Sequence, residues 1–130
     1  MFIPSIDKLT IDIEQSIDWL NNYDCSNLPD RLIIAFAKTR DIDLKCFKRD
    51  SEKLNIIKTN RKKYGGNIRF QKIITDVKSS VQKNLDGFLI AKEFFIKTDE
   101  FINQFGADKI CVIPEWDNVY SIVLNSGCLE

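Results

Sequence analysis

The 130-residue chain contains no histidine, and this absence removes several kinds of active site at once. Ser-His-Asp and Cys-His catalysis, histidine-based ribonuclease chemistry and imidazole metal sites all need the missing side chain. Any catalysis would have to use carboxylates, lysine, arginine, tyrosine, a thiol or a carboxylate-bound metal ion. The missing histidine therefore favours a protein that is not an enzyme.

Long apolar runs and a leader sequence are also missing. The longest apolar run, Leu32 to Ala37, is far shorter than the ~20 residues that a membrane-spanning helix needs. The N-terminal residues do not place a basic region before an apolar one, as a signal peptide does. We therefore expect a single domain over residues 1–130 that works in the cytoplasm.

The four cysteines show no Cys-x-x-Cys spacing, so the sequence offers no thiolate zinc site. In the cytoplasm, cysteines that are far apart in the chain are expected to be free and mostly buried thiols. The residues concerned are Cys25, Cys46, Cys111 and Cys128.

The sequence does contain a strong segregation of charge. Residues 38–83 hold 14 Lys and Arg residues against five acidic residues, a net charge of +9. Residues 1–37 and 84–130 have net charges of −4 and −5, so the neutrality of the whole chain hides a basic middle between two acidic ends.

The hydrophobic pattern predicts an α+β fold that begins with an amphipathic helix and contains a central sheet. In the first helix, apolar residues recur at steps of three and four. Residues 30–38 fit a strand or a helix that begins after Pro29, and we interpret them together with residues 42–47 as the two strands of a hairpin. Residues 51–64 are interpreted as a helix and residues 68–70 as a further strand. The apolar residues of the first helix are Ile6, Leu9, Ile13, Ile17 and Leu20.

The second half of the chain gives a mixed pattern. Residues 73–85 favour a helix, residues 88–96 fit a strand or a helix, and residues 98–105 indicate a short helix. Residues 109–113 and 119–124 are predicted to form a C-terminal β-hairpin, with Trp116 near the tip of its loop.

Basic residues surround the Gly65-Gly66 turn and form the first candidate site. Cations beside the stackable rings of Tyr64 and Phe70 suit a nucleic-acid surface, but they equally suit an acidic protein partner or a solvated helix face. An exposed Trp116 would add an anchor for a protein interface. The predicted partner-binding residues are Lys58, Arg61, Lys62, Lys63, Arg69, Lys72 and Trp116.

Asp30, Asp43 and Lys45 form a second candidate site. Pro29-Asp30, an apolar run and then Asp43-Leu44-Lys45 resemble the pattern of the PD-(D/E)XK nucleases. The resemblance implies a strand hairpin on which Asp30 and Asp43 bind Mg²⁺, while Lys45 orients or activates the attacking water.

Two interpretations follow from these patterns. The first is a small, non-catalytic interaction protein of the inhibitor, immunity or regulatory type, which docks on another protein through its basic surface and needs no cofactor. The alternative is a nucleic-acid-binding protein, which could be a nuclease that uses Mg²⁺. Neither interpretation involves a membrane, and the sequence does not define the oligomeric state.

Overall fold

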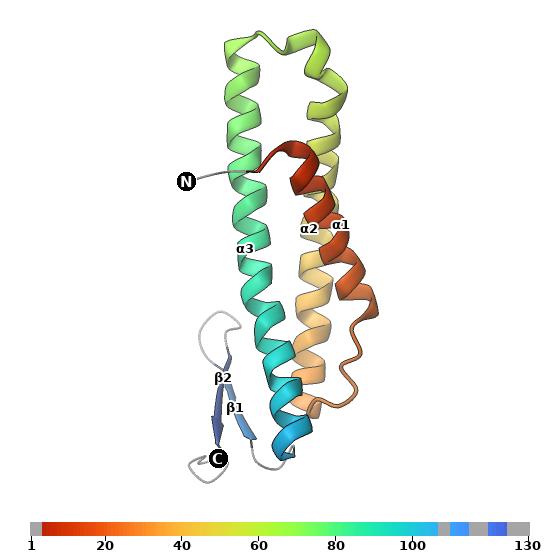
Figure 1. Cartoon of the computed structure of the whole chain (residues 1–130), viewed down its shortest axis with the longest axis vertical. Helices are drawn as coiled ribbons and strands as arrows, with labels where there is room; N and C mark the ends of the chain where they lie inside the picture. Colours follow the sequence, from red (N-terminus) through yellow and green to blue (C-terminus); the bar gives the residue numbers. More distant parts are fainter. Residues whose placement is uncertain (1–3, 107–109, 115–119, 125–130) are drawn as a thin grey trace. The chain divides into compact units, whose positions relative to one another are not determined.

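Helices make up nearly all of residues 4–106 in the computed structural model, which describes residues 4–106, 110–114 and 120–124 (Figure 1). The three helices are α1 (Ile6–Asn22), α2 (Asp30–Tyr64) and α3 (Ile68–Phe105). The strands β1 (Ile110–Pro114) and β2 (Tyr120–Leu124) follow α3 and pair with each other antiparallel. The described residues contain no central sheet, so the predicted α+β fold class is wrong and helices dominate the fold.

Helix α1 confirms the amphipathic helix that the sequence predicts, although Ile17 of the predicted stripe is only half-buried. The Ser5 side chain caps the helix, because its hydroxyl oxygen accepts a hydrogen bond of 3.2 Å from the Lys8 backbone N–H. Asp7 lies in the first turn, where a negative charge is favourable for the helix dipole. The stripe at steps of three and four is buried at Ile6, Leu9, Ile13, Ser16 and Leu20.

The hairpin predicted from residues 30–38 and 42–47 is wrong, because a single helix runs through both segments. The carbonyl of Pro29 accepts the first hydrogen bonds of α2, from the backbone N–H groups of Leu32 and Ile33. The connection Thr39-Arg40-Asp41 contains neither glycine nor proline and therefore does not interrupt the helix. The apparent alternation in residues 42–47 was too short to exclude the helical period, with which Phe36, Phe47 and Leu54 are all buried.

Helix α3 also passes through predicted interruptions. Residues 68–70 are its first turn and not a strand, and the Asn67 side-chain oxygen accepts a hydrogen bond of 3.1 Å from the Phe70 backbone N–H. Gly87 lies inside the helix, and Thr98 is buried there with its hydroxyl donating to the Phe94 carbonyl at 2.7 Å. The helix ends before Gly106, whose φ of 92° is a left-handed conformation that glycine adopts readily.

The contacts of the chain divide it into two compact units, and α2 and α3 contribute to both. Unit 1 comprises Met1–Tyr23 and Arg40–Leu89, and unit 2 comprises Asp24–Thr39 and Ile90–Glu130. In unit 1, α1, α2 and α3 share a core in which the Phe88 ring contacts the rings of Trp19 and Phe47, with centroids 5.8 and 5.3 Å apart. In unit 2, the Phe36 and Phe95 rings meet edge to face at 5.2 Å.

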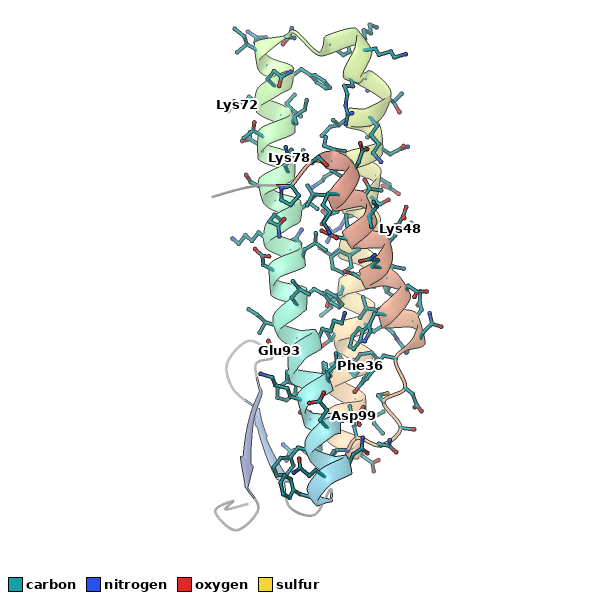
Figure 2. The ribbon with its side chains drawn as sticks, viewed as in Figure 1. Phe36, Lys48, Lys72, Lys78, Glu93 and Asp99 are labelled. Atoms are coloured by element: carbon teal, nitrogen blue, oxygen red, sulfur yellow. The ribbon has the colours of Figure 1, made fainter. Side chains whose placement is uncertain are left out.

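No helix within the described residues has both the length and the apolar character needed to cross a membrane. Charged side chains occur along both long helices, α2 and α3, and Lys48, Lys72 and Glu93 are labelled among them in Figure 2.

Candidate docking surface

The basic residues around the glycine pair lie at one end of unit 1, where α2 turns into α3 (Figure 1). We call residues 58–74 the helical tip. The Tyr64 and Phe70 rings lie 5.8 Å apart across the turn, and the Gln71 side-chain amide donates a hydrogen bond to the Gly65 carbonyl. A Cβ atom on Gly65 would lie 2.7 Å from the Arg61 carbonyl oxygen, so this close turn requires glycine.

The helical tip has a single sign of charge. From Lys53 to Thr75 the chain has seven basic residues and no acidic residue. The tip contains six of the seven predicted partner-binding residues, whereas Trp116 lies outside the described residues. The six are Lys58, Arg61, Lys62, Lys63, Arg69 and Lys72.

Most of these cations are not neutralised. The Lys58 ammonium lies 3.7 Å from the Asp7 carboxylate at the start of α1. The other five basic residues are exposed and form no ion pair with any residue that the structure describes. The Lys63 ammonium lies 5.1 Å from the centre of the Tyr64 ring, a distance compatible with a cation–π contact. The tip therefore presents five positive charges to the solvent.

Helix geometry gives part of the reason for this arrangement. Arg61, Lys62 and Lys63 occupy the last turn of α2, where positive charge is favourable beside the free carbonyl groups. This effect stabilises the end of α2 by itself, and it does not depend on a ligand. It does not apply to Arg69 in the first turn of α3, where positive charge is unfavourable for the dipole, or to Lys72 in the following turn.

Exposed apolar side chains accompany the cations. Ile68 is 86% exposed and Ile73 is 52% exposed, while Ile56 just before the tip is 61% exposed. Tyr64, at 40%, adds an exposed ring. The sequence indicates the cations and both rings but not the exposed aliphatic residues, because the strand predicted at residues 68–70 would have buried Ile68. The tip is thus both basic and apolar.

The structure does not bring together the residues that resemble a nuclease site. Asp30 and Asp43 lie on the same helix, α2, separated by about three and a half helical turns. Lys45 is two residues beyond Asp43, which places it on the opposite side of the helix, and its ammonium pairs with Asp41 at 3.2 Å. The two neighbouring strands that would bring these three side chains to one Mg²⁺ ion are absent from this part of the chain.

The described residues also contain no group of three or more Cys, Asp or Glu side chains arranged to hold a metal ion. Within these residues Cys25 and Cys46 are free, as predicted, although both are only half-buried. Burial raises the pKa of the Cys46 thiol, and the nearby Asp50 carboxylate raises it further. Cys46 is therefore a protonated, weakly nucleophilic thiol at neutral pH.

Asp50 is the one buried acidic residue among those that the structure describes, with 2% of its surface exposed. Its carboxylate accepts a 2.9 Å hydrogen bond from the Asn84 side-chain amide, and the Cys46 thiol lies 3.9 Å from the same oxygen. The bond from Asn84 joins α3 to α2 inside unit 1, whereas Cys46 and Asp50 both lie on α2. The group is best described as a structural polar contact.

Comparisons with known proteins add no functional information. No protein-family model, no curated protein and no solved structure matches this chain. The case for function therefore depends on the helical tip alone.

Proposed function

We propose that this chain is a small, non-catalytic interaction protein that docks on another protein through its helical tip. The supporting observation is the set of five exposed cations without ion pairs among the described residues: Arg61, Lys62, Lys63, Arg69 and Lys72. Exposed like charges repel one another, and Arg69 also opposes the dipole at the start of α3. An acidic partner would remove both costs.

A partner surface of this kind would act mainly on the rate and the specificity of association. Complementary charge accelerates encounter and excludes like-charged partners, while apolar and aromatic contacts at the centre supply most of the affinity. The tip offers both kinds of side chain, with Ile68, Ile73 and Tyr64 exposed among the cations. An inhibitor, an immunity-type protein or a regulatory subunit would use its surface in this way. The free thiols Cys25 and Cys46 fit the reducing cytoplasm as the place of action.

Charge reversal with a matched control tests this proposal. The double variant Arg61→Glu/Arg69→Glu reverses two charges of the tip, and Lys48→Glu/Lys83→Glu reverses two exposed charges of unit 1 outside the tip. Each purified chain is used to capture proteins from lysate of the native host, with and without nuclease treatment, and bound proteins are quantified by mass spectrometry.

We expect one protein to be retained by the parent chain and by the control variant, but lost from the tip variant. Retention of that protein by all three chains, or its loss from both variants, would overturn the docking role of the tip. A bound fraction that disappears after nuclease treatment would instead support a nucleic-acid-binding protein. That alternative predicts an affinity that falls steeply with salt concentration.

A further inference from the structure

An apolar stripe lies along the paired helices α2 and α3 in unit 1, and α1 helps to bury part of it. Leu54 and Ile57 of α2 are 1% and 2% exposed, and Val81 and Leu85 of α3 are 0% and 4% exposed. Leu9 of α1 is completely buried in the same unit. Along this length, three helices provide enough apolar surface for a closed core.

The stripe continues into the helical tip at the same helical spacing. On α2 it continues from Leu54 and Ile57 to Tyr64, and on α3 it continues backward from Val81. Burial decreases along this path: Tyr64 is exposed, and Phe70, Ile74 and Val77 of α3 are only half-buried. We call this continuation the open seam, and it consists of Tyr64, Phe70 and Ile74 in the tip and of Val77 just outside it.

The open seam begins where α1 begins. The ion pair between Asp7 and Lys58 places the first turn of α1 beside α2 at the base of the tip. Figure 1 shows that α2 and α3 continue past this point to their connecting turn, with no third helix beside them in this part of unit 1. The decrease in burial therefore has a simple cause, which is the absence of a third helix along residues 61–77 among the residues described.

We propose that a partner protein supplies this third helix, and that it is an acidic amphipathic helix which packs on the open seam. This inference rests on the proposed docking function of the tip. The occupant would lie on the same two helices as α1, further toward the turn. Its apolar side chains would cover Phe70 and Ile74, and its carboxylates would pair with Arg61 and Arg69.

Helix α1 is the precedent for this occupant within the chain itself. It is amphipathic, it carries the exposed acidic residues Asp7, Glu14 and Asp18, and it forms an ion pair with the basic face of α2. A docked helix recognises its partner through apolar residues at steps of three and four, and the open seam has that spacing. The open seam thus continues an interface that already accepts an acidic helix.

The aliphatic side chains favour a helix over a nucleic acid. Nucleic acids are bound by cations and by rings that stack on bases. Ile74 and Val77 offer neither, but an apolar helix face would bury them. A bilayer of anionic lipid would also bind cations and apolar residues. It would not, however, require the regular stripe formed by residues on two paired helices.

Synthetic peptides of defined pattern test the inference on the full chain. The probe is a heptad peptide with leucine along one stripe and glutamate at the flanking positions. One control has the same composition in an order that destroys the stripe, and a second has lysine in place of glutamate. Binding is followed by fluorescence anisotropy, and duplex DNA and phosphatidylserine vesicles are measured beside the peptides.

We expect the acidic heptad peptide to bind at least about tenfold more tightly than either control peptide. Phe70→Ser and Tyr64→Ser should each abolish this preference, whereas Ile42→Ser, at an exposed position of α2 outside the tip, should preserve it. Far-ultraviolet circular dichroism checks that each variant keeps the helical content of the parent, and having two seam variants protects the test if one of them fails to fold.

Three results would overturn the inference. In the first, the acidic heptad and its reordered control bind equally, and the Arg61→Glu/Arg69→Glu variant binds neither. This result would support a basic docking surface but exclude recognition of a helix. Preferential binding of DNA or of vesicles would assign the seam to another kind of partner. In the third, none of the probes binds, which would also exclude an acidic helix as the occupant of the seam. In each case the proposed docking function is judged separately, by capture of the native partner.

Discussion

Two lengths of the same paired helices differ in what covers them. Near Phe47, Leu54 and Phe88, α1 lies against α2 and α3, and the inward-facing side chains are buried. In the helical tip the pair continues without α1, and Phe70 and Ile74 stay half-buried. The two lengths share one hydrophobic period, so the period predicts which face is apolar, but only the third helix determines whether that face is buried.

The largest expected difference between the two lengths is the cost of removing a ring. Phe47 is 1% exposed, so Phe47→Ala should lower the free energy of unfolding by about 3–5 kcal/mol through lost burial and a cavity. Phe70→Ala, in the tip, should cost about 1 kcal/mol because little packing is lost. Urea unfolding measures both. Equal costs would show that the tip is as tightly packed as the three-helix part, which would contradict the open seam.

Two side-chain hydrogen bonds, one in each length, provide a second comparison with a smaller expected difference in unfolding free energy. Asn84→Ala removes the amide that donates to the buried Asp50 carboxylate, and we expect a loss of about 1–3 kcal/mol in unfolding free energy. The matched change in the tip is Asn60→Ala, because this side chain donates at 2.8 Å to the Ile56 carbonyl on its own helix. That variant should be close to neutral. A neutral Asn84→Ala would mean that water replaces the lost amide.

Some of this architecture was predictable and some was not, for identifiable physical reasons. The stripe from Ile6 to Leu20 spans many helical turns and has a cap at Ser5, so α1 was predicted correctly. Residues 42–47 are too few for their alternation to be distinguished from a helix, and Asp86-Gly87 is a strong turn signal that α3 overrides. In each wrong case, packing between helices decided the conformation, and single-sequence propensity does not contain that information.

The candidate site, too, was predictable from the sequence only in part. The absence of acidic residues between Lys53 and Thr75 is visible in the sequence and correctly indicated where cations gather. The sequence did not predict that α1 begins beside Lys58, and because α1 extends no further toward the turn, Phe70 and Ile74 stay uncovered. The apolar half of the docking surface is thus a property of the packing.

Two glycines allow a comparison of backbone requirements. Gly65→Ala should destabilise the tip by about 1 kcal/mol or more, since its Cβ would lie 2.7 Å from the Arg61 carbonyl oxygen. Gly87→Ala should instead stabilise the protein by about 0.5–1 kcal/mol, because a Cβ there meets nothing within 4 Å and alanine favours a helix interior. Thermal unfolding distinguishes the two signs. A stabilising Gly65→Ala would show that the turn relaxes freely, and the tip would then be less ordered than its contacts indicate.

The smallest expected effect concerns a half-buried carboxylate in the three-helix part. Burial raises the pKa of Asp43 above its ordinary value of 3.8, so the folded state favours the protonated form. The contribution of this group to stability is therefore complete below pH 3.8 and is lost as the pH rises through the folded-state pKa. Asp43→Asn, which stays neutral, should be more stable than the parent chain at neutral pH.

Urea unfolding of Asp43→Asn and the parent chain, repeated from neutral pH down toward pH 3.8, checks this sign. The gain should shrink as the pH falls, because the parent carboxyl becomes protonated and then resembles the amide. Asp76→Asn, at an exposed position of α3 close to the tip, is the matched control for the change from aspartate to asparagine. A gain in Asp43→Asn that did not depend on pH would trace the effect to helix propensity or packing. The contrast between the covered length and the tip would then rest on the aromatic, asparagine and glycine variants.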